Sequence, residues 1–313
     1  TTMHWGQRKL LLSEIEFLTN YSSFGDLVVY AGAAPAIHTP MLAKLFPQLK
    51  FILIDPIPFS IKQTKNIELR NKYFTSEMAQ EFVDKDVLFI CDIRIANDTK
   101  DYKPSEKEVK NDMLIQQEWV KIMKPKYSML KFRLPWNEER MEYLDGKLYV
   151  QPWGPRTTTE TRLIVEKSQI NSKKIWDCKK YEEQMFYFNT ITRCKCYIIP
   201  IKIKHLDTCY DCVSEIKIIN NYLIKYKQIK NSVKNITELS NDISSNIMKN
   251  KKSNISDYYY HKYLRQKNNN KQKYNKNYTH SLKQLIQKLR TSIQKNNNND
   301  FRKYLNEIFN FIN

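Results

Sequence analysis

Glycine is scarce in this chain, with only 5 residues among 313, and none follows Gly154. Proline also ends early, since the last of the 11 prolines is Pro200. Because glycine and proline are the residues that mark turns, the final 113 residues differ in kind from the rest. We therefore divide the chain into a domain of residues 1–212 and an extension of residues 213–313.

Long apolar runs are missing as well. The longest, such as residues 51–54 and 87–90, are far shorter than the roughly 20 residues that a membrane-spanning helix needs. This excludes an integral membrane protein, and we expect no membrane partner. The six cysteines are irregularly spaced and no leader resembles a signal peptide, so we expect a reducing compartment rather than secretion.

Acidic residues are outnumbered, with 33 Asp and Glu against 52 Lys and Arg, which gives a net charge of +19 and favours a polyanionic partner such as nucleic acid. Residues 241–313 contain 16 Asn, and 15 basic against 4 acidic residues. This segment is either an RNA-binding tail or a partly disordered extension of biased composition. Residues 282–293 and 301–309 keep helical spacing, which predicts a helix pair or a docking surface.

Apolar runs rich in Val, Ile, Phe and Tyr alternate with helical patterns over the first 205 residues, which predicts an α/β fold with a mainly parallel sheet covered on both faces. After Lys131 strands follow one another, so we expect an antiparallel C-terminal portion. The predicted strands are 27–30, 51–54, 87–90, 127–132, 148–151, 163–165, 185–188 and 196–203, and the predicted helices include residues 10–18, 41–45 and 113–123.

Residues just after the strands are candidates for ligand binding, because open sheets bind ligands at the carboxyl ends of their strands. The first strand is followed by small residues at 31–36, which would let backbone amides approach a ligand but also suit a tight turn. The second ends in Asp55, 23 residues past Gly32, near where such folds place an acid that accepts ribose hydroxyls. Asp55 could equally cap a turn, but together the two features predict a nucleoside cofactor.

A lysine near the end of a buried strand is unfavourable unless it is paired or neutral. Lys131 stands in such a place, between Leu130 and Phe132, and Asp92 follows the preceding strand. Desolvation favours the neutral amine, which could act as a base. Alternatively, Lys131 forms a structural ion pair with Asp92.

Five spaced segments carry a family resemblance. They are Gly6-Gln7-Arg8-Lys9-Leu10-Leu11-Leu12, Val29-Tyr30-Ala31-Gly32-Ala33-Ala34-Pro35, Asp92-Ile93-Arg94, Leu130-Lys131-Phe132-Arg133-Leu134-Pro135-Trp136 and Tyr181-Glu182-Glu183. In this order they resemble the poxvirus cap-specific mRNA (nucleoside-2′-O-)-methyltransferases, a family that also provides the small, processivity subunit of the viral poly(A) polymerase. The resemblance runs from about His4 to about Cys212.

The resemblance implies a Rossmann-like S-adenosylmethionine-dependent methyltransferase fold and methyl transfer to the ribose 2′-hydroxyl of the first transcribed nucleotide of 7-methylguanosine-capped mRNA. The family's catalytic tetrad falls on Lys9, Asp92, Lys131 and Glu160. A ribose hydroxyl is a poor nucleophile near neutral pH and needs a base, which is Lys131 in this assignment. Asp92 and Glu160 would hold the ammonium that forms, and Lys9 would favour the neutral amine by repulsion.

The family's cofactor pattern is also found in this sequence. It falls on Gln7, Tyr30, Gly32, Ala36, Asp55 and Phe74. Two positions depart from it, because the family has Gly at Ala36 and Arg at Ile57. The methyl group of Ala36 lies at a position where the family's backbone contacts the cofactor. It therefore predicts a weakened or rearranged cofactor pocket.

Cap recognition is implied at three positions. Trp136 matches the family's stacking aromatic, while Glu138 and Glu182 match its two acidic guanine readers, with Glu138 where the family has Asp. A methylated guanine is cationic and stacks between aromatic rings, and a carboxylate accepts its N1 and N2 hydrogens. Alternatively, Trp136 covers the core and the acids are solvated. The second stacking aromatic falls upstream of Thr1, and we expect Arg94 and the basic extension to contact the RNA backbone.

The cysteines allow one further interpretation. Cys194 and Cys196, with Cys209 and Cys212, supply the four thiols of a structural zinc site. A Cys-x-Cys pair on a strand is not the usual close pair, however, so we expect buried free thiols and no metal.

Two alternatives to a cap methyltransferase stay open. The chain could be a non-catalytic RNA-binding processivity subunit, with Ala36 and Ile57 as signs of a weakened cofactor pocket, and the two activities could coexist. It could also methylate another RNA position. The resemblance implies capped mRNA and a viral poly(A) polymerase catalytic subunit as partners, and location in the host cytoplasm, in the viral factory, and in the virion.

Overall fold

The computed structural model describes residues 5–94, 104–198, 201–203 and 206–254, together with residues 288 and 291. The chain forms two compact units, residues 1–251 and 252–313. The predicted helical segments 282–293 and 301–309 lie, apart from residues 288 and 291, outside the described residues.

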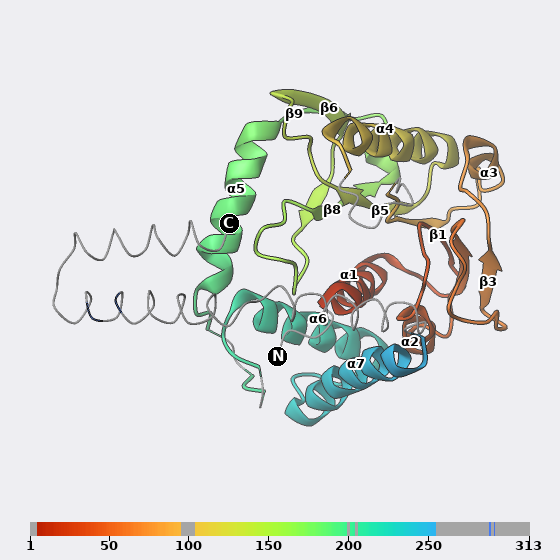
Figure 1. Ribbon diagram of the computed structural model, residues 1–313. Helices are drawn as coiled ribbons and strands as arrows, with labels where there is room; N and C mark the ends of the chain where they lie inside the picture. Colours follow the sequence, from red (N-terminus) through yellow and green to blue (C-terminus); the bar gives the residue numbers. More distant parts are fainter. Residues whose placement is uncertain are drawn as a thin grey trace, which may run out of the picture. The chain divides into compact units, whose positions relative to one another are not determined.

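A seven-stranded sheet with the order β3-β2-β1-β4-β5-β8-β7 forms the centre of the first unit (Figure 1). Neighbours from β3 to β5 are parallel, whereas β8 is antiparallel to both β5 and β7. Strands β6 and β9 form a separate antiparallel pair. The predicted mainly parallel sheet with an antiparallel end is therefore confirmed. The strands are β1 Leu27–Ala31, β2 Lys50–Ile54, β3 Ile67–Arg70, β4 Leu88–Cys91, β5 Tyr127–Phe132, β6 Arg140–Leu144, β7 Lys147–Tyr149, β8 Thr161–Glu166 and β9 Lys173–Asp177.

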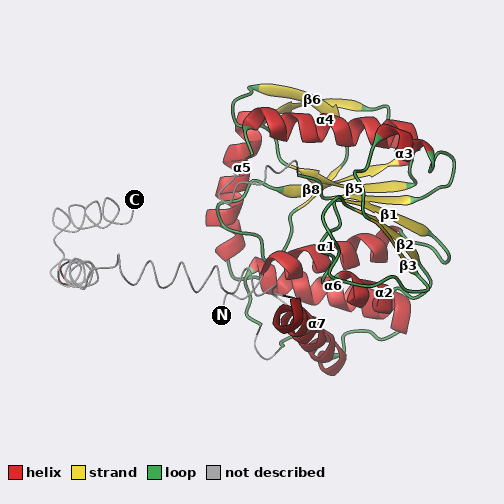
Figure 2. Ribbon diagram, turned by 45° about the vertical axis from the view of Figure 1, so that its right-hand side comes forward, coloured by secondary structure: helices red, strands yellow, loops and turns green. Residues whose placement is uncertain are grey.

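Helices cover both faces of this sheet, as Figure 2 shows. Because side chains alternate along a strand, Val28 and Tyr30 of β1 enter one core, whereas Val29 and Ala31 enter the other. The first core includes α1, α2, α6 and α7, and the second includes α3, α4 and α5. The helices are α1 Trp5–Tyr21, α2 Thr39–Leu45, α3 Ser76–Gln80, α4 Glu106–Met123, α5 Cys178–Thr190, α6 Tyr210–Lys227 and α7 Val233–Asn254, with short 3-10 turns η1 Lys167–Gln169 and η2 Thr192–Cys194.

Helix α4 illustrates how the sequence sets an element's limits. Ser105 accepts from the backbone N–H of Glu108, and Glu108 accepts in turn from the N–H of Ser105, which forms a capping box. Lys124 ends the helix in a left-handed conformation with φ of 49°. Between these limits, residues at helical spacing enter the core: Val109, Met113, Trp119, Val120 and Met123.

Helices α6 and α7 belong to the first compact unit, although their sequence lacks glycine and proline. Arg8 of α1 makes a buried ion pair with Glu215 of α6, and its guanidinium also donates to Ser240 and Ser244 of α7. Both helices also contribute isoleucines to the first core. The end of that unit therefore lies at Lys251 rather than at Cys212, because turn composition does not report which helices bury an apolar face.

Two predicted strands are wrong. Residues 185–188 lie within α5, which Asp177 caps by accepting from the N–H of Lys180 at 2.8 Å. Residues 196–198 and 201–203 form no strand. A short apolar run does not distinguish a strand from one side of a helix, and the buried residues of α5 recur at helical spacing.

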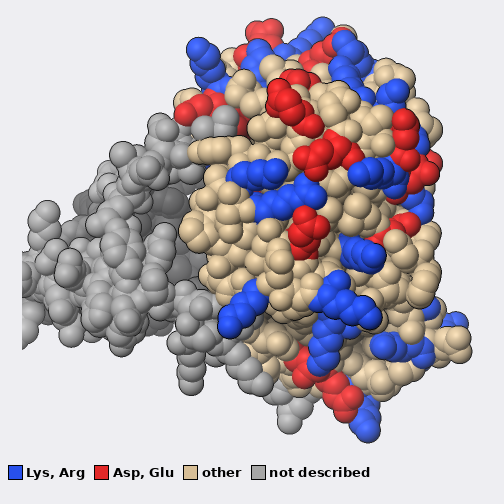
Figure 3. Space-filling view, turned by 90° about the vertical axis from the view of Figure 1, so that its right-hand side faces the viewer, with Lys and Arg blue, Asp and Glu red and all other residues tan. Residues whose placement is uncertain are grey.

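Charge is mixed on the face of the first unit drawn in Figure 3, where Lys and Arg lie interspersed with Asp and Glu. Among the described residues, no helix combines the length and the apolar character that crossing a membrane requires. This face therefore has no continuous basic surface, despite the chain's net charge of +19.

Candidate active site

Gly32 allows the loop after β1 to lie against the end of β4. The N–H of Asp92 donates to Ala31 O at 3.0 Å, so the two strand ends run together. Gly32 has a φ of +77°, and a Cβ there would lie 2.7 Å from Ile93 N and 2.8 Å from the carbonyl carbon of Asp92. The backbone that positions Asp92 thus requires glycine at residue 32. This steric requirement is a second reason for glycine there, beside the close approach of a cofactor predicted from the sequence.

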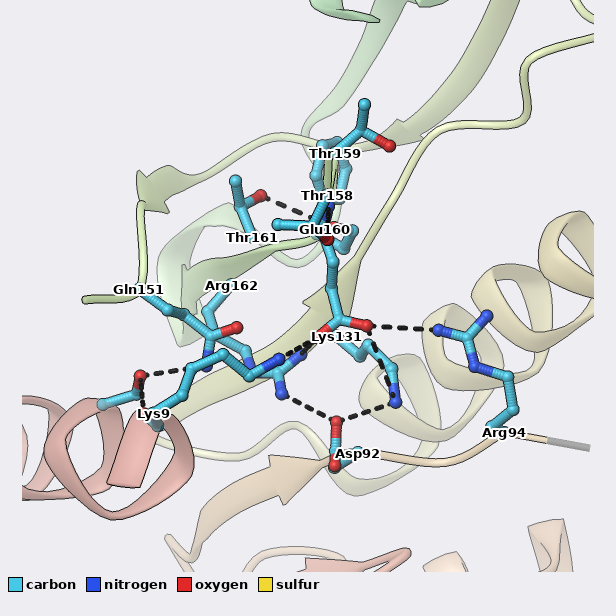
Figure 4. A network of polar contacts seen from close by, with 12 residues as sticks. Lys9, Asp92, Arg94, Lys131, Gln151, Thr158, Thr159, Glu160, Thr161 and Arg162 are labelled. Carbon is cyan, nitrogen blue, oxygen red and sulfur yellow. Dashed lines mark hydrogen bonds and ion pairs between the residues drawn. The ribbon is translucent and has the colours of Figure 1, made fainter. Parts of the chain in front are cut away.

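The four tetrad residues come together from four separate segments (Figure 4). Lys131, on β5, lies with its Nζ 3.0 Å from Asp92 Oδ1 and 3.8 Å from Glu160 Oε2. Lys9, on α1, donates from Nζ to Glu160 Oε1 at 2.9 Å. Their side chains keep small exposed fractions of 13 to 17%. The set predicted from colinear motifs therefore forms one cluster that solvent still reaches.

Arg162 joins this cluster and was not predicted. Its guanidinium lies 2.7 Å from Asp92 Oδ1 and 3.4 Å from Glu160 Oε1, and its side chain is only 2% exposed. In the β5–β8 pairing Arg162 stands directly opposite Lys131. The sequence carried a signal for it, namely a cation directly before the apolar run of residues 163–165.

The neighbouring cations lower the pKa of both carboxyl groups in the cluster. Burial raises the pKa of Asp92, but Lys131 and Arg162 outweigh this effect and hold that pKa below its ordinary value. The same holds for Glu160, whose pKa lies well below its ordinary value because Lys9 contributes as well. Burial lowers the pKa of Lys9, and its contact with Glu160 opposes that change. Both acids are therefore carboxylates near neutral pH and can hold an ammonium group.

Gln7 and Tyr30 of the predicted cofactor set are linked through buried His38 and Glu14. His38 Nδ1 lies 2.8 Å from Gln7 Oε1, and its Nε2 lies 2.9 Å from a Glu14 oxygen. Tyr30 donates to the same carboxylate at 2.9 Å, and burial raises the pKa of its hydroxyl. His38 thereby orients Gln7, whereas the Tyr30 side chain is 2% exposed and packs toward α1.

The next two members of that set are Ala36, in the loop after β1, and Asp55, directly after β2. Ala36 adopts a φ of +61°, which favours glycine, yet its methyl is 1% exposed and packs within the first core. Asp55, after β2, accepts from Ala34 N at 3.0 Å and from Ile57 N at 2.8 Å. Asp55 therefore fastens the loop, and each of its oxygens keeps further acceptor capacity.

Phe74 lies in the second core rather than at an open site. Its ring is 4.7 Å from Trp119 and 5.5 Å from Phe89 between centroids, and the residue is 7% exposed. Any contact with a cofactor at this position would involve its backbone, because the ring packs against these two neighbours.

Trp136 is the predicted cap-stacking residue, and it is 49% exposed. Its Nε1 donates to Thr159 Oγ1 at 3.2 Å, and the Arg133 guanidinium lies 4.1 Å from the ring centroid. Glu106 holds both groups, since it accepts from Arg133 at 2.6 Å and from Trp136 N at 2.8 Å. The indole is thus fixed in place while much of its surface remains accessible.

The two predicted acidic guanine readers lie on different elements. Glu138 accepts from Lys110 Nζ at 2.7 Å and keeps 32% side-chain exposure. Glu182 lies half-buried on α5, next to Tyr181, whose hydroxyl donates to Thr159 O at 2.6 Å. The structure thereby connects α5 to the residue that holds Trp136.

Arg94 is the predicted RNA contact, and it extends the cluster outward. It donates to Glu160 Oε2 at 3.2 Å with 27% side-chain exposure. A small open hollow, with a cavity volume of about 10 Å³, lies beside it. Its lining consists of Ile93, Arg94, Val109, Asp112, Met113, Gln116, Lys131 and Arg133. The three cations among these residues are each paired with a carboxylate.

The profile described as "Poly A polymerase regulatory subunit" matches residues 2–250. The chain belongs to the poly(A) polymerase regulatory subunit family. This confirms the resemblance predicted from the sequence.

Proteins from two poxviruses are similar to the chain. Proteins named cap-specific mRNA (nucleoside-2′-O-)-methyltransferase from myxoma virus (strain Lausanne) and fowlpox virus (strain NVSL) are each 30% identical to it over 61% of this chain. The match covers 62% of the myxoma protein and 68% of the fowlpox protein, so it spans less than two thirds of the former.

A solved structure titled as bluetongue virus VP4, a multifunctional RNA-capping production line, is similar at 12% identity with a TM-score of 0.43. It covers 55% of this chain, and the chain covers 30% of it.

Proposed function

We propose that this protein transfers a methyl group from S-adenosylmethionine to the ribose 2′-hydroxyl of the first transcribed nucleotide in 7-methylguanosine-capped mRNA. The observation that carries this proposal is the convergence of Lys9, Asp92, Lys131 and Glu160 at the carboxyl end of the sheet. A subunit that only bound RNA would not need two carboxylates held against two lysines. The names of its poxvirus relatives support the same activity.

The chain's residues fit the cofactor. The loop after β1 turns through left-handed conformations at Gly32 and Ala36, and Asp55 stands at the end of the neighbouring strand with acceptor capacity to spare. Gln7 and Asp55 would bind its polar groups. Ile57, 58% exposed, leaves the outer edge of this site without the cation found in the family. When bound, S-adenosylmethionine would supply an electrophilic methyl group, which the ribose oxygen receives as the carbon–sulfur bond breaks.

Lys131 would move the proton. After its ammonium group loses a proton to solvent, the neutral Nζ takes the proton of the ribose 2′-hydroxyl, which makes that oxygen nucleophilic. The ammonium that results stays between Asp92 and Glu160, at the 3.0 and 3.8 Å distances seen here. Arg162 and Lys9 keep both acids ionised. The two carboxylates therefore attract the protonated amine without removing its proton.

Trp136 would hold the cap. A cationic 7-methylguanine stacks on the exposed part of its indole, while Glu138 and Glu182 accept the guanine N–H groups. Arg94 and Arg133, at the hollow beside Lys131, would contact RNA phosphates. This arrangement would bring the first transcribed ribose toward the tetrad.

Methyl transfer from radiolabelled S-adenosylmethionine to short capped RNA tests the proposal. Uncapped RNA and capped RNA that already carries the 2′-O-methyl group are the controls. We expect label only in the capped, unmethylated RNA. Equal labelling of uncapped RNA would show methylation of another position, and no labelling in the presence of bound RNA would contradict a methyltransferase.

The family match over residues 2–250 favours a second role as the regulatory subunit of a viral poly(A) polymerase. Capped mRNA and that polymerase would then be its partners, and the two roles coexist. Lys131→Ala, which removes the base, should leave any stimulation of polyadenylation unchanged. Loss of both activities together would indicate one shared site.

We also propose that the protein acts in the host cytoplasm, in the viral factory, and in the virion. All six cysteines, which are free thiols in the structure, are consistent with a reducing compartment. Immunolabelling of infected cells and of purified particles tests this, and a signal confined to the nucleus would contradict it.

A further inference from the structure

Three side chains with metal-binding atoms converge just before helix α6, away from the tetrad. The carboxylate of Asp207 and the thiols of Cys209 and Cys212 offer one ligand atom each, and these atoms all lie within 4.8 Å of one another. The exposure increases from the buried Cys212 through the half-buried Cys209 to the exposed Asp207. One side of the group is therefore open to solvent.

The backbone holds these side chains together. The N–H of Cys209 donates to Asp207 Oδ1 at 2.7 Å, and hydrogen bonds also join that carboxylate to the thiols of both cysteines. Cys209 is the N-cap of α6, an 18-residue helix, and Cys212 lies in its first turn.

We propose that Asp207, Cys209 and Cys212 bind a thiophilic divalent cation, for which Zn²⁺ is the best match. Two sulfur ligands and one carboxylate oxygen suit zinc, which prefers tetrahedral sites of sulfur, nitrogen and oxygen. Binding forms two zinc–sulfur bonds and one zinc–oxygen bond and releases the two thiol protons to solvent. The fourth position faces solvent and takes water.

This site differs from the four-thiolate arrangement considered from the sequence. Cys194 and Cys196 are exposed, and within the described residues the group of converging donors comprises Asp207, Cys209 and Cys212. The close Cys-x-x-Cys pair is retained, while a carboxylate two residues upstream replaces the second pair.

A cation here would fasten the start of α6, where a chain of contacts leads toward the tetrad. Asp211, in the same helical turn, makes an ion pair with Arg193 and accepts from Trp153 N at 2.9 Å. Arg193 donates in turn to Gln151 O at 3.3 Å, and Gln151 donates to Ser13, one turn of α1 beyond Lys9. The expected role is structural, and the inference does not depend on the proposed methyl transfer.

Cobalt titration of the full chain under reducing conditions tests the site. Co²⁺ replaces zinc and gives intense charge-transfer absorption when thiolates coordinate it. We expect this absorption in the unaltered protein, its loss in the double variant Cys209→Ser/Cys212→Ser, and its weakening or shift in Asp207→Asn. The matched control is Cys194→Ser/Cys196→Ser, which removes two thiols outside the group and should keep the full signal.

Two further measurements make the result decisive. Circular dichroism shows whether each variant is folded, and thermal unfolding with and without zinc should show a rise in Tm that only the Cys209→Ser/Cys212→Ser protein loses. Absorption that persists in that variant, or is absent from the unaltered protein, would overturn the proposal. A Cys209–Cys212 disulfide in a peptide map, without cobalt binding in the reduced chain, would identify a redox pair instead.

Discussion

The guanidinium of Arg162 lies 2.7 Å from Asp92 Oδ1, on the strand position directly opposite Lys131. Two cations thus face one another across neighbouring strands, and Asp92 binds both of them. Glu160, 3.4 Å from Arg162, also pairs with Lys131 and Lys9. This arrangement explains how a buried, permanently charged guanidinium and a lysine can occupy one site.

Replacing Arg162 by Met should therefore raise the pKa of both Asp92 and Glu160 and reduce methyl transfer by about tenfold or more. Both carboxyl groups have a lower pKa in the folded chain than in the unfolded chain. Their ionised forms therefore stabilise the fold above a pH of about 4, the ordinary carboxyl pKa. This contribution to stability is lost as the pH falls from that value through the folded pKa. Acid unfolding followed by circular dichroism should begin at higher pH in the variant. Arg140→Met, at an exposed position on β6, is the control.

Gly32→Ala should damage the site through the backbone. The new Cβ would lie within 3.0 Å of Asp92 and Ile93 backbone atoms, which must shift. Gly25→Ala is a matched control, because Gly25 has a similar φ of +83° but nothing within 4 Å of the added Cβ. Both variants should lose about 1 to 2 kcal/mol from left-handed strain. Only Gly32→Ala should lose more stability and methyl transfer, as thermal unfolding and the labelling assay measure. Equal losses would remove the steric explanation.

Ala36→Gly tests whether the chain's departure from the family weakens the cofactor site. The Ala36 methyl is buried in the first core, so its removal loses about 0.8 kcal/mol of apolar burial while relieving left-handed strain of similar size. We expect S-adenosylmethionine to bind the variant within about twofold of the original affinity, since about 0.4 kcal/mol corresponds to that ratio. Calorimetric titration checks it. Much tighter binding would show that the methyl obstructs the cofactor.

Trp136→Ala should raise the KM for capped RNA by about fivefold to hundredfold, because base–aromatic stacking contributes roughly 1 to 3 kcal/mol. Trp136→Phe should restore most of the affinity, and kcat should change little. Glu106→Gln, which weakens the hold on Arg133 and Trp136, should give an intermediate KM. Phe24→Ala, at a residue that is 90% exposed, serves as the aromatic control. An unchanged KM for Trp136→Ala would contradict the stacking assignment.

Glu16 gives a pH-dependent prediction about stability. Burial raises the pKa of its carboxyl to about 7, and Lys147 opposes this only in part. The folded chain therefore favours the protonated acid, and stability is lost as the pH rises from the unfolded value of about 4.3 through 7. Glu16→Gln should raise Tm relative to the unaltered chain above pH 7 and change it little near pH 4. The exposed Glu183→Gln should show no such trend.

Much of the fold could be predicted from the sequence alone. The runs at residues 27–30, 51–54 and 87–90 are apolar throughout, which is the pattern typical of a strand buried on both faces. The run at 185–188 was misassigned, because four apolar residues fit one turn of helix as well as a strand. Helices α6 and α7 were separated from the domain, since composition does not show that Arg8 reaches Glu215 across more than 200 residues.

The sequence by itself indicated which residues we propose as catalytic, because Lys9, Asp92, Lys131 and Glu160 match positions of a family that the chain resembles. Only the tertiary structure decided how they are held: Arg162 between the two acids, Gly32 beneath Asp92, and Asp207 beside two cysteines. Motifs record residue types along the chain. Burial and charge balance depend on which distant strands and helices come into contact, and no local pattern contains that information.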